Sequence, residues 1–255
     1  MDTLRAMTWN VWWRFGDAWR EREHGIIHVL QAVQPDIVGL QECWADSGTT
    51  QPRLLGDALG LHAAFIPVGL PPGQVADEVG VAMGLGLLSR WPIAAVVAEP
   101  LSSGKRDLSA LVATVTHPRG PLRVVVGATS WEPERSVETT MQIEELEQLV
   151  LEVPHVLPSL LLADLNRDEH FAAVRHLHLV DAWNAARPGA DARTYSSTNR
   201  FAESLAADQH DRRIDHVRFT RGSSGARAIA ARVIRDEPDG FPPSDHYPVV
   251  VDLEF

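Results

Sequence analysis

Six short polar motifs constrain this chain most, because each borders an apolar run and together they span nearly its whole length. In chain order they are Thr8–Asn10, Gln41–Glu42, Leu87–Pro92, Ala163–Asn166, Arg213–His216 and Ser244–Pro248. Polar groups that gather at the ends of buried strands are typical of a layered α/β body. The six motifs therefore predict one active site built from distant parts of the chain.

Apolar periodicity predicts the elements that carry these motifs. A helix is expected over Glu23–Val33, where Pro35 stops it before the next strand. A second helix is expected over Ser136–Val150, with Met141, Leu146 and Leu149 on its apolar side. The predicted strands are Leu4–Asn10, Ile37–Leu40, Gly86–Ser89, Ala110–Thr116, Leu122–Thr129, Ser159–Ala163, His216–Phe219 and Val249–Leu253.

The residue types in the motifs indicate metal-assisted hydrolysis. Glu42, Asp245 and the amide of Asn10 offer the hard oxygen ligands that suit Mg²⁺ or Mn²⁺. His246 follows one aspartate directly, and Asp215 is a further carboxylate able to charge or orient an imidazole. Any one of these motifs recurs by chance, so the prediction depends on the ordered set.

As a set, the motifs resemble the endonuclease/exonuclease/phosphatase superfamily, over residues 4 to 254 and closest to its compact bacterial branch. The resemblance implies a DNase I-like α/β fold: a four-layered α/β sandwich of two mostly antiparallel sheets, face to face and flanked by helices. Periodicity alone leaves an open mixed sheet as an alternative. No linker divides the chain, so we expect a single domain over residues 1–255.

The resemblance also implies roles on the metal side of the site. Glu42 matches the principal metal ligand, Asn10 lies beside it, and Asp245 is a further ligand, directly or through water. Asp164 matches the residue that orients or deprotonates the attacking water, and Asn166 the amide that donates to a phosphate oxygen. From the residues alone, an Asx turn after the strand is the alternative for this pair.

His246 matches a histidine that the family places against the phosphate. The resemblance implies that it is protonated there and supported by Asp215. A carboxylate partner raises the pKa of an imidazole, so the charged form is able to stabilise a pentacoordinate transition state. We expect Asp164, Asn166, Asp215 and His246 to be the catalytic residues.

Four residues near the motifs are candidate substrate contacts. Trp13, Trp131 and Tyr195 are aromatic residues that would stack a base or cover an apolar headgroup. Arg213, next to Arg212, would bind a second phosphate or pair with an acid.

The chain departs from the family pattern on the phosphate side. Most relatives carry a phosphate-contacting histidine before the central helix, and here that position falls on Ala128 or Ser130, depending on the register. Leu85 stands where an amide is common. Losing one transition-state donor costs roughly a hundredfold to a thousandfold in rate.

Composition limits the classes of substrate and partner that we expect for this chain. The net charge is −11, and the arginines are scattered among acids, so no basic stripe for a nucleic-acid backbone is visible. This balance favours a small phosphorylated substrate over duplex nucleic acid. No apolar run is long enough for a membrane span, no signal segment is evident, and Cys43 is the single cysteine, so a cytoplasmic monomer is expected.

These observations lead to three hypotheses. The first is a Mg²⁺- or Mn²⁺-dependent phosphodiesterase or phosphatase that acts by in-line water attack. The second is the same metal scaffold repurposed for other chemistry in specialised metabolism, and the third is a weakly active or non-catalytic binding protein. Substrate choice is expected to lie in the long loops Gly69–Gly84 and Thr194–Asp211.

Overall fold

The computed structural model describes residues 2–16, 18–68, 80–103, 108–152, 156–186, 188–202 and 211–255. Most of the loop predicted at Gly69–Gly84, and residues 203–210 of the second predicted loop, lie outside these ranges. Within the described part, every helix is too short or too polar to cross a membrane.

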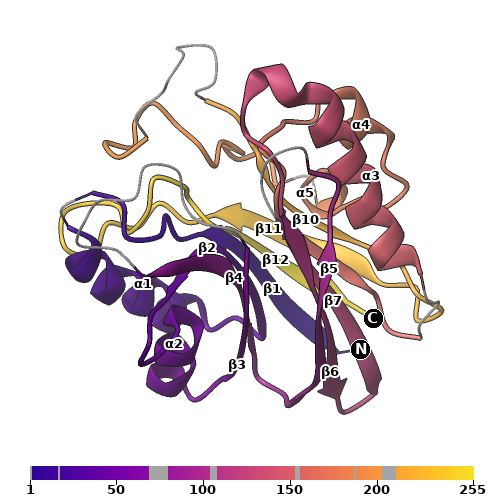
Figure 1. Cartoon of the computed structure of the whole chain (residues 1–255). Coiled ribbons are helices and arrows are strands. Elements are labelled where there is room, and N and C mark those ends of the chain that lie inside the picture. The colour runs from indigo at the N-terminus through magenta and orange to yellow at the C-terminus, as the bar shows by residue number, and fades with distance from the viewer. Residues whose placement is uncertain are drawn as a thin grey trace.

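Two mixed sheets of six strands each form the centre of the molecule (Figure 1). In spatial order the first contains β11 (Arg227–Val233), β12 (Val249–Glu254), β1 (Thr3–Asn10), β2 (Ile37–Ala45), β4 (Ala82–Ser89) and β3 (His62–Pro67). The second contains β5 (Ile93–Pro100), β6 (Ser109–His117), β7 (Gly120–Ala128), β8 (Leu160–Asp164), β10 (Asp215–Phe219) and β9 (Val180–Asp181). Only the pairs β1–β2 and β7–β8 are parallel among these strands, so both sheets are mostly antiparallel.

Helices cover the outer face of each sheet, as Figure 1 shows. α1 (Trp19–Val33) and α2 (Gln51–Leu59) pack on the first sheet through residues such as Ile26, Leu30 and Leu55. α3 (Ser136–Leu151) and α4 (Ala172–His176) pack on the second through Ile143, Leu146 and Val174. The described residues also form two short helices, η2 (Pro133–Arg135) and α5 (Ala182–Ala186).

A third apolar cluster fills the space between the sheets and uses alternate residues of each strand. Leu4 and Ala6 of β1 belong to it, whereas Met7 and Trp9 belong to the cluster under α1. This two-residue alternation places one face of every central strand toward the partner sheet. Helices, sheet, sheet and helices form four layers, which confirms the predicted sandwich and excludes the open mixed sheet.

The sheets approach each other closely at Gly39. A Cβ atom on Gly39 would lie 2.5 Å from the Cβ of Leu162 in the opposite sheet, so this position requires glycine. Two residues later, the buried amide of Gln41 donates across the gap to the carbonyl of Leu162 at 3.2 Å. The close approach fixes the spacing of the polar residues that follow on both sheets.

The structure contains each predicted helix and strand, with changes at their ends. One predicted side-chain orientation was wrong. Met141 was expected on the apolar side of α3, but it is 46% exposed. The buried face of α3 instead includes polar residues, among them Thr139 and Gln142, which bond to the loop after β7. Hydrophobic spacing alone missed this face because part of it is polar.

Candidate active site

One row of three residues crosses the second sheet at its end. Asp164 of β8 is in register with Ala128 of β7 on one side and with Asp215 of β10 on the other. Residues paired across strands project to the same face of a sheet. Val126, Leu162 and Val217, two positions deeper, belong to the core between the sheets, so the row faces the first sheet.

The first sheet contributes Asn10 and Glu42 opposite this row. Asn10 ends β1 and pairs in register with Gln41. Glu42 occupies a β-bulge, where the register between β2 and β4 shifts between Leu40 and Cys43, and its φ is 53°. A bulge re-aims a side chain, and a positive φ in a non-glycine residue is often found at functional sites.

Asn10 is a bridge between the two sheets. Its amide nitrogen donates to Oδ2 of Asp164 at 3.0 Å, and its Oδ1 accepts from the backbone N–H of Trp12 at 2.9 Å. Burial raises the pKa of Glu42, and a hydrogen bond from the amide of Asn10 offsets part of this shift. Asn10 thus presents N–H groups to the carboxylates, which favours an orienting role over the predicted role of metal ligand.

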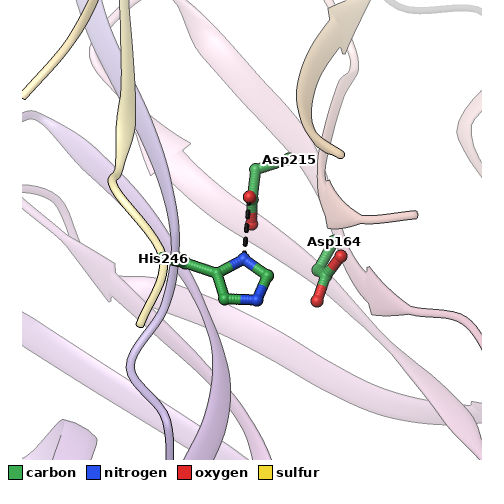
Figure 2. A group of neighbouring side chains, drawn as sticks. All are labelled: Asp164, Asp215 and His246. Atoms are coloured by element: carbon green, nitrogen blue, oxygen red, sulfur yellow. Dashed lines mark hydrogen bonds and ion pairs between the residues drawn. The ribbon is translucent and has the colours of Figure 1, made fainter. Parts of the chain in front are cut away.

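Asp215 and His246 form a buried pair (Figure 2). Nδ1 of His246 lies 2.9 Å from Oδ2 of Asp215, which is fully buried. Burial alone would lower the pKa of His246, but Asp215, Asp245 and Asp164 outweigh it and hold this pKa well above its usual value. Asp164 lies beside the pair, and its carboxylate comes within 4.8 Å of the ligand atoms of both residues.

Of the other carboxylates of the site, Asp164 and Asp245 are buried and Glu42 is half-buried. Burial raises the pKa of Asp245 to about 7, and the nearby charge of Glu42 adds to the shift. Burial and the charge of Asp215 raise the pKa of Asp164 to about 6, and burial also raises the pKa of Glu42. So many acids in one small volume indicate a place for a cation.

Two residues that the motifs did not single out hold the loops around the site. Arg22 of α1 is 1% exposed and donates to the backbone carbonyls of Val11, Trp12, Trp13, Phe15 and Pro243. Asn199 donates to the carbonyls of Ser244 and Asp245 at 2.9 and 3.0 Å. Their partners are backbone atoms, so no side-chain spacing in the sequence signals either role.

Asp164 and Asn166 form the local turn that the sequence left as an alternative. The N–H of Asn166 donates to Oδ1 of Asp164 at 2.9 Å, and Asn166 has a φ of 50°. Its side-chain amide donates to the carbonyl of Thr129 at 2.9 Å. Asp164 thus lies at the site, whereas the amide of Asn166 is tied to the loop after β7.

Two of the four predicted substrate contacts lie away from this centre. Trp13 is 2% exposed, packs with Trp44 and Val81, and donates to the carbonyl of Ala82, so its ring has no free face for a substrate. Arg213 is 4% exposed and pairs with Asp181 at 2.9 Å. The structure therefore corrects both predictions, because internal partners occupy these side chains.

The other two predicted contacts remain near the surface. Tyr195 is half-buried, and its ring centroid lies 5.1 Å from that of His246. Trp131 is half-buried in the loop after β7, where its carbonyl accepts from Arg167.

The two registers for the absent histidine are now distinguishable. Ala128 lies in the row with Asp164 and faces the site. Ser130 is 4% exposed, and its side chain bonds to Gln142 and Glu138 of α3. Ala128 is therefore the position from which an imidazole would reach the site. Leu85 is buried in the core between the sheets, so it offers no polar group.

Comparisons with known proteins agree with this geometry. The profile of the endonuclease/exonuclease/phosphatase family matches residues 7–246, whereas no match was found among curated proteins. A solved endonuclease/exonuclease/phosphatase from Beutenbergia cavernae is 26% identical, with a TM-score of 0.75, and the match covers 100% of this chain and 72% of that one.

Two more distant structures share the fold. TDP2 from D. rerio, complexed with single-strand DNA product, is 18% identical with a TM-score of 0.80, and both chains are covered completely. The catalytic domain of human Nocturnin, with bound sulfate anion, is 19% identical with a TM-score of 0.73, over 99% of this chain and 94% of that one. On the family profile and the shared fold together, the chain belongs to the endonuclease/exonuclease/phosphatase family.

Proposed function

We propose that this protein is a Mg²⁺- or Mn²⁺-dependent phosphoric-ester hydrolase that acts on a small phosphorylated molecule by in-line water attack. One observation supports this most: the carboxylates of Glu42, Asp164 and Asp245 lie around the buried Asp215–His246 pair at the end of the sandwich, which gathers four acids at one place. Such a site needs positive charge, which a divalent cation supplies.

The donor set fits a hard cation. Oδ1 of Asp215 is buried without a hydrogen-bond partner among the described residues, and burial raises the pKa values of Asp164 and Asp245 despite the nearby charge of His246. Asp164, Asp215 and His246 also group closely enough to hold an ion. However, a protonated His246 cannot be a ligand, so Glu42 and Asp245 are the better pair.

When bound there, the ion would polarise a phosphoryl oxygen and stabilise the charge of the transition state. The chain's own residues then divide the remaining work. Asp164, oriented by Asn10, accepts the proton of the attacking water, and a pKa of about 6 suits a base near neutral pH. Asp215 holds Nδ1 of His246, which leaves Nε2 to donate to a phosphoryl oxygen.

The acidic net charge favours a small substrate, because a protein that neutralises many backbone phosphates would need a basic surface. The D. rerio TDP2 structure holds single-strand DNA product, so short single strands belong among the tested substrates. We also propose that residues 1–255 form one domain, since the core between the sheets uses Leu4 near one end and Leu253 near the other.

A metal-supplemented activity screen tests the proposal. Phosphodiesters, nucleotides, sugar phosphates, lipid headgroups and short single-stranded DNA would be offered with Mg²⁺, with Mn²⁺ and with a chelator. Glu42→Gln is the blank, and Glu144→Gln, at an exposed site on α3, is the matched control. The proposal requires hydrolysis that depends on metal, is lost in the blank and persists in the control.

The repurposed scaffold is the second candidate, and two observations favour it. Ala128 faces the site where relatives carry an imidazole, and Leu85 is buried where they carry an amide. A protein that binds metal at Glu42 but hydrolyses none of the phosphoric esters would support this candidate, or a binding role, over the hydrolase.

A further inference from the structure

The phosphate side of the candidate site, formed by Ala128, Asp164, Asp215 and His246, carries more negative than positive charge. Any phosphoryl group bound there would face the carboxylates of Asp164 and Asp215, with His246 as their nearest cation. Ala128 adds no charge to the row. A second cation on this side would offset the repulsion, because ionised donors are the strong hydrogen-bond partners of phosphate oxygens.

Three neighbouring arginines are already occupied. Arg22 is bound to five backbone carbonyls, and Arg213 is buried against Asp181. Arg167 donates to the carbonyls of Trp131, Asn166 and Glu132, so its guanidinium holds the loops beside the site.

Arg212 differs from these three. Its side chain is 37% exposed, and its recorded ion pair, from Nε to Asp168, is long at 3.7 Å. Among the described residues, no hydrogen bond involves its terminal Nη groups. A phosphate oxygen would therefore not have to displace a tight partner.

The backbone directs Arg212 to the same side as His246. Tyr195 forms an antiparallel bridge with Arg212 through two backbone hydrogen bonds of 3.1 Å, and a second antiparallel bridge with His246. Side chains of residues that face each other across antiparallel segments project to one side. The stacking of Tyr195 near His246, with centroids 5.1 Å apart, agrees with this arrangement.

The loop after β8 places Arg212 at the same rim. Its ion-pair partner Asp168 lies four residues after Asp164. Arg167 directly follows Asn166, and burial together with the charge of Arg212 lowers the pKa of Arg167. Arg212 thus lies between this loop and Tyr195.

We propose that Arg212 binds a nonbridging oxygen of the substrate phosphoryl group and supplies the positive charge that Ala128 leaves absent. This inference rests on the proposed function for its substrate, but binding of an oxyanion tests it separately. Arg212 would then be a catalytic residue and not a structural one.

Inorganic phosphate, titrated calorimetrically into the metal-loaded full chain, is the direct probe. Arg212→Gln should weaken phosphate binding by roughly tenfold or more, since it removes a charged donor. The matched control is Arg175→Gln, at an exposed position on α4, which should bind phosphate like the wild type. Equal phosphate affinity in the two variants, with metal affinity intact, would overturn the proposal.

Kinetics give the second readout. On any hydrolysed substrate, Arg212→Gln should lower kcat/KM by roughly a hundredfold. Added guanidinium should restore part of the rate of Arg212→Ala but not of Glu42→Gln. An unchanged rate in Arg212→Gln would contradict the role. If the wild type hydrolyses nothing, the hydrolase proposal fails, whereas the phosphate titration still decides the role of Arg212.

Discussion

The two sides of the candidate site, one proposed to bind the metal and the other the phosphoryl group, differ in how many functional side chains they retain. The proposed metal side contains the buried Asp245 and the half-buried Glu42, and it is held by residues such as Asn10 and Asn199. The phosphate side has a small side chain at Ala128 and a half-exposed Arg212. Under the proposed function, this difference corresponds to a retained metal centre with a changed substrate contact.

Removing a carboxylate from the metal side should have the largest effect on metal affinity and on hydrolysis. Glu42→Gln keeps the shape but removes one hard ligand, so metal affinity should fall by roughly a hundredfold or more and hydrolysis should vanish. Calorimetric titration with Mn²⁺ measures the affinity, with Glu144→Gln as control. Unchanged binding would move the metal to another set of ligands.

The Asp215–His246 pair lies between the two sides of the site. Disrupting this pair should cause the next largest loss of rate. Asp215→Asn removes the charge that raises the pKa of His246, so the rate should fall by roughly a hundredfold to ten-thousandfold. Because the imidazole then loses its proton at lower pH, the alkaline limb of the pH–rate profile should shift to lower pH. A profile with the same alkaline limb would show that His246 does not act as the charged donor.

Adding an imidazole at Ala128 tests whether the phosphate side limits the rate. Ala128→His places a donor in the row with Asp164, and turnover of a nitrophenyl phosphodiester should rise by roughly a hundredfold. Ser130→His is the matched control, since that side chain bonds to α3 instead of facing the site. If Ala128→His folds, binds metal and is no faster, the repurposed scaffold replaces the hydrolase.

The smallest expected effect is on stability. The pKa values of Asp164 and Asp245, about 6 and about 7, lie above their ordinary values. Their contribution to the free energy of unfolding is therefore present at low pH and is lost as the pH rises through 6 to 7. A bound cation removes this penalty, so the increase in Tm on adding Mn²⁺ should be larger near pH 8 than near pH 5.5. Thermal melts with Mn²⁺ and with chelator measure it, and equal increases would argue against these carboxylates facing the ion.

The family resemblance of the ordered motifs predicted the fold, and the apolar runs predicted the buried strands that end at the site residues. Asp164 and Asp215 lie where the pattern placed them. The bulge at Glu42 was not predictable, since it arises from pairing with β4. Nor was the choice between Arg212 and Arg213: Arg213 lies before β10 begins, and Arg212 pairs with Tyr195, a contact distant in sequence.

A crystal structure with Mn²⁺ and orthovanadate tests the two-sided site most directly. Anomalous scattering locates the ion, and the oxyanion marks the phosphate position. The account predicts manganese at the carboxylates of Glu42 and Asp245, with the vanadate contacting His246 and Arg212 while Asp215 keeps its bond to Nδ1. Manganese bound by Asp164, Asp215 and His246 together, or a vanadate that does not contact His246, would contradict it.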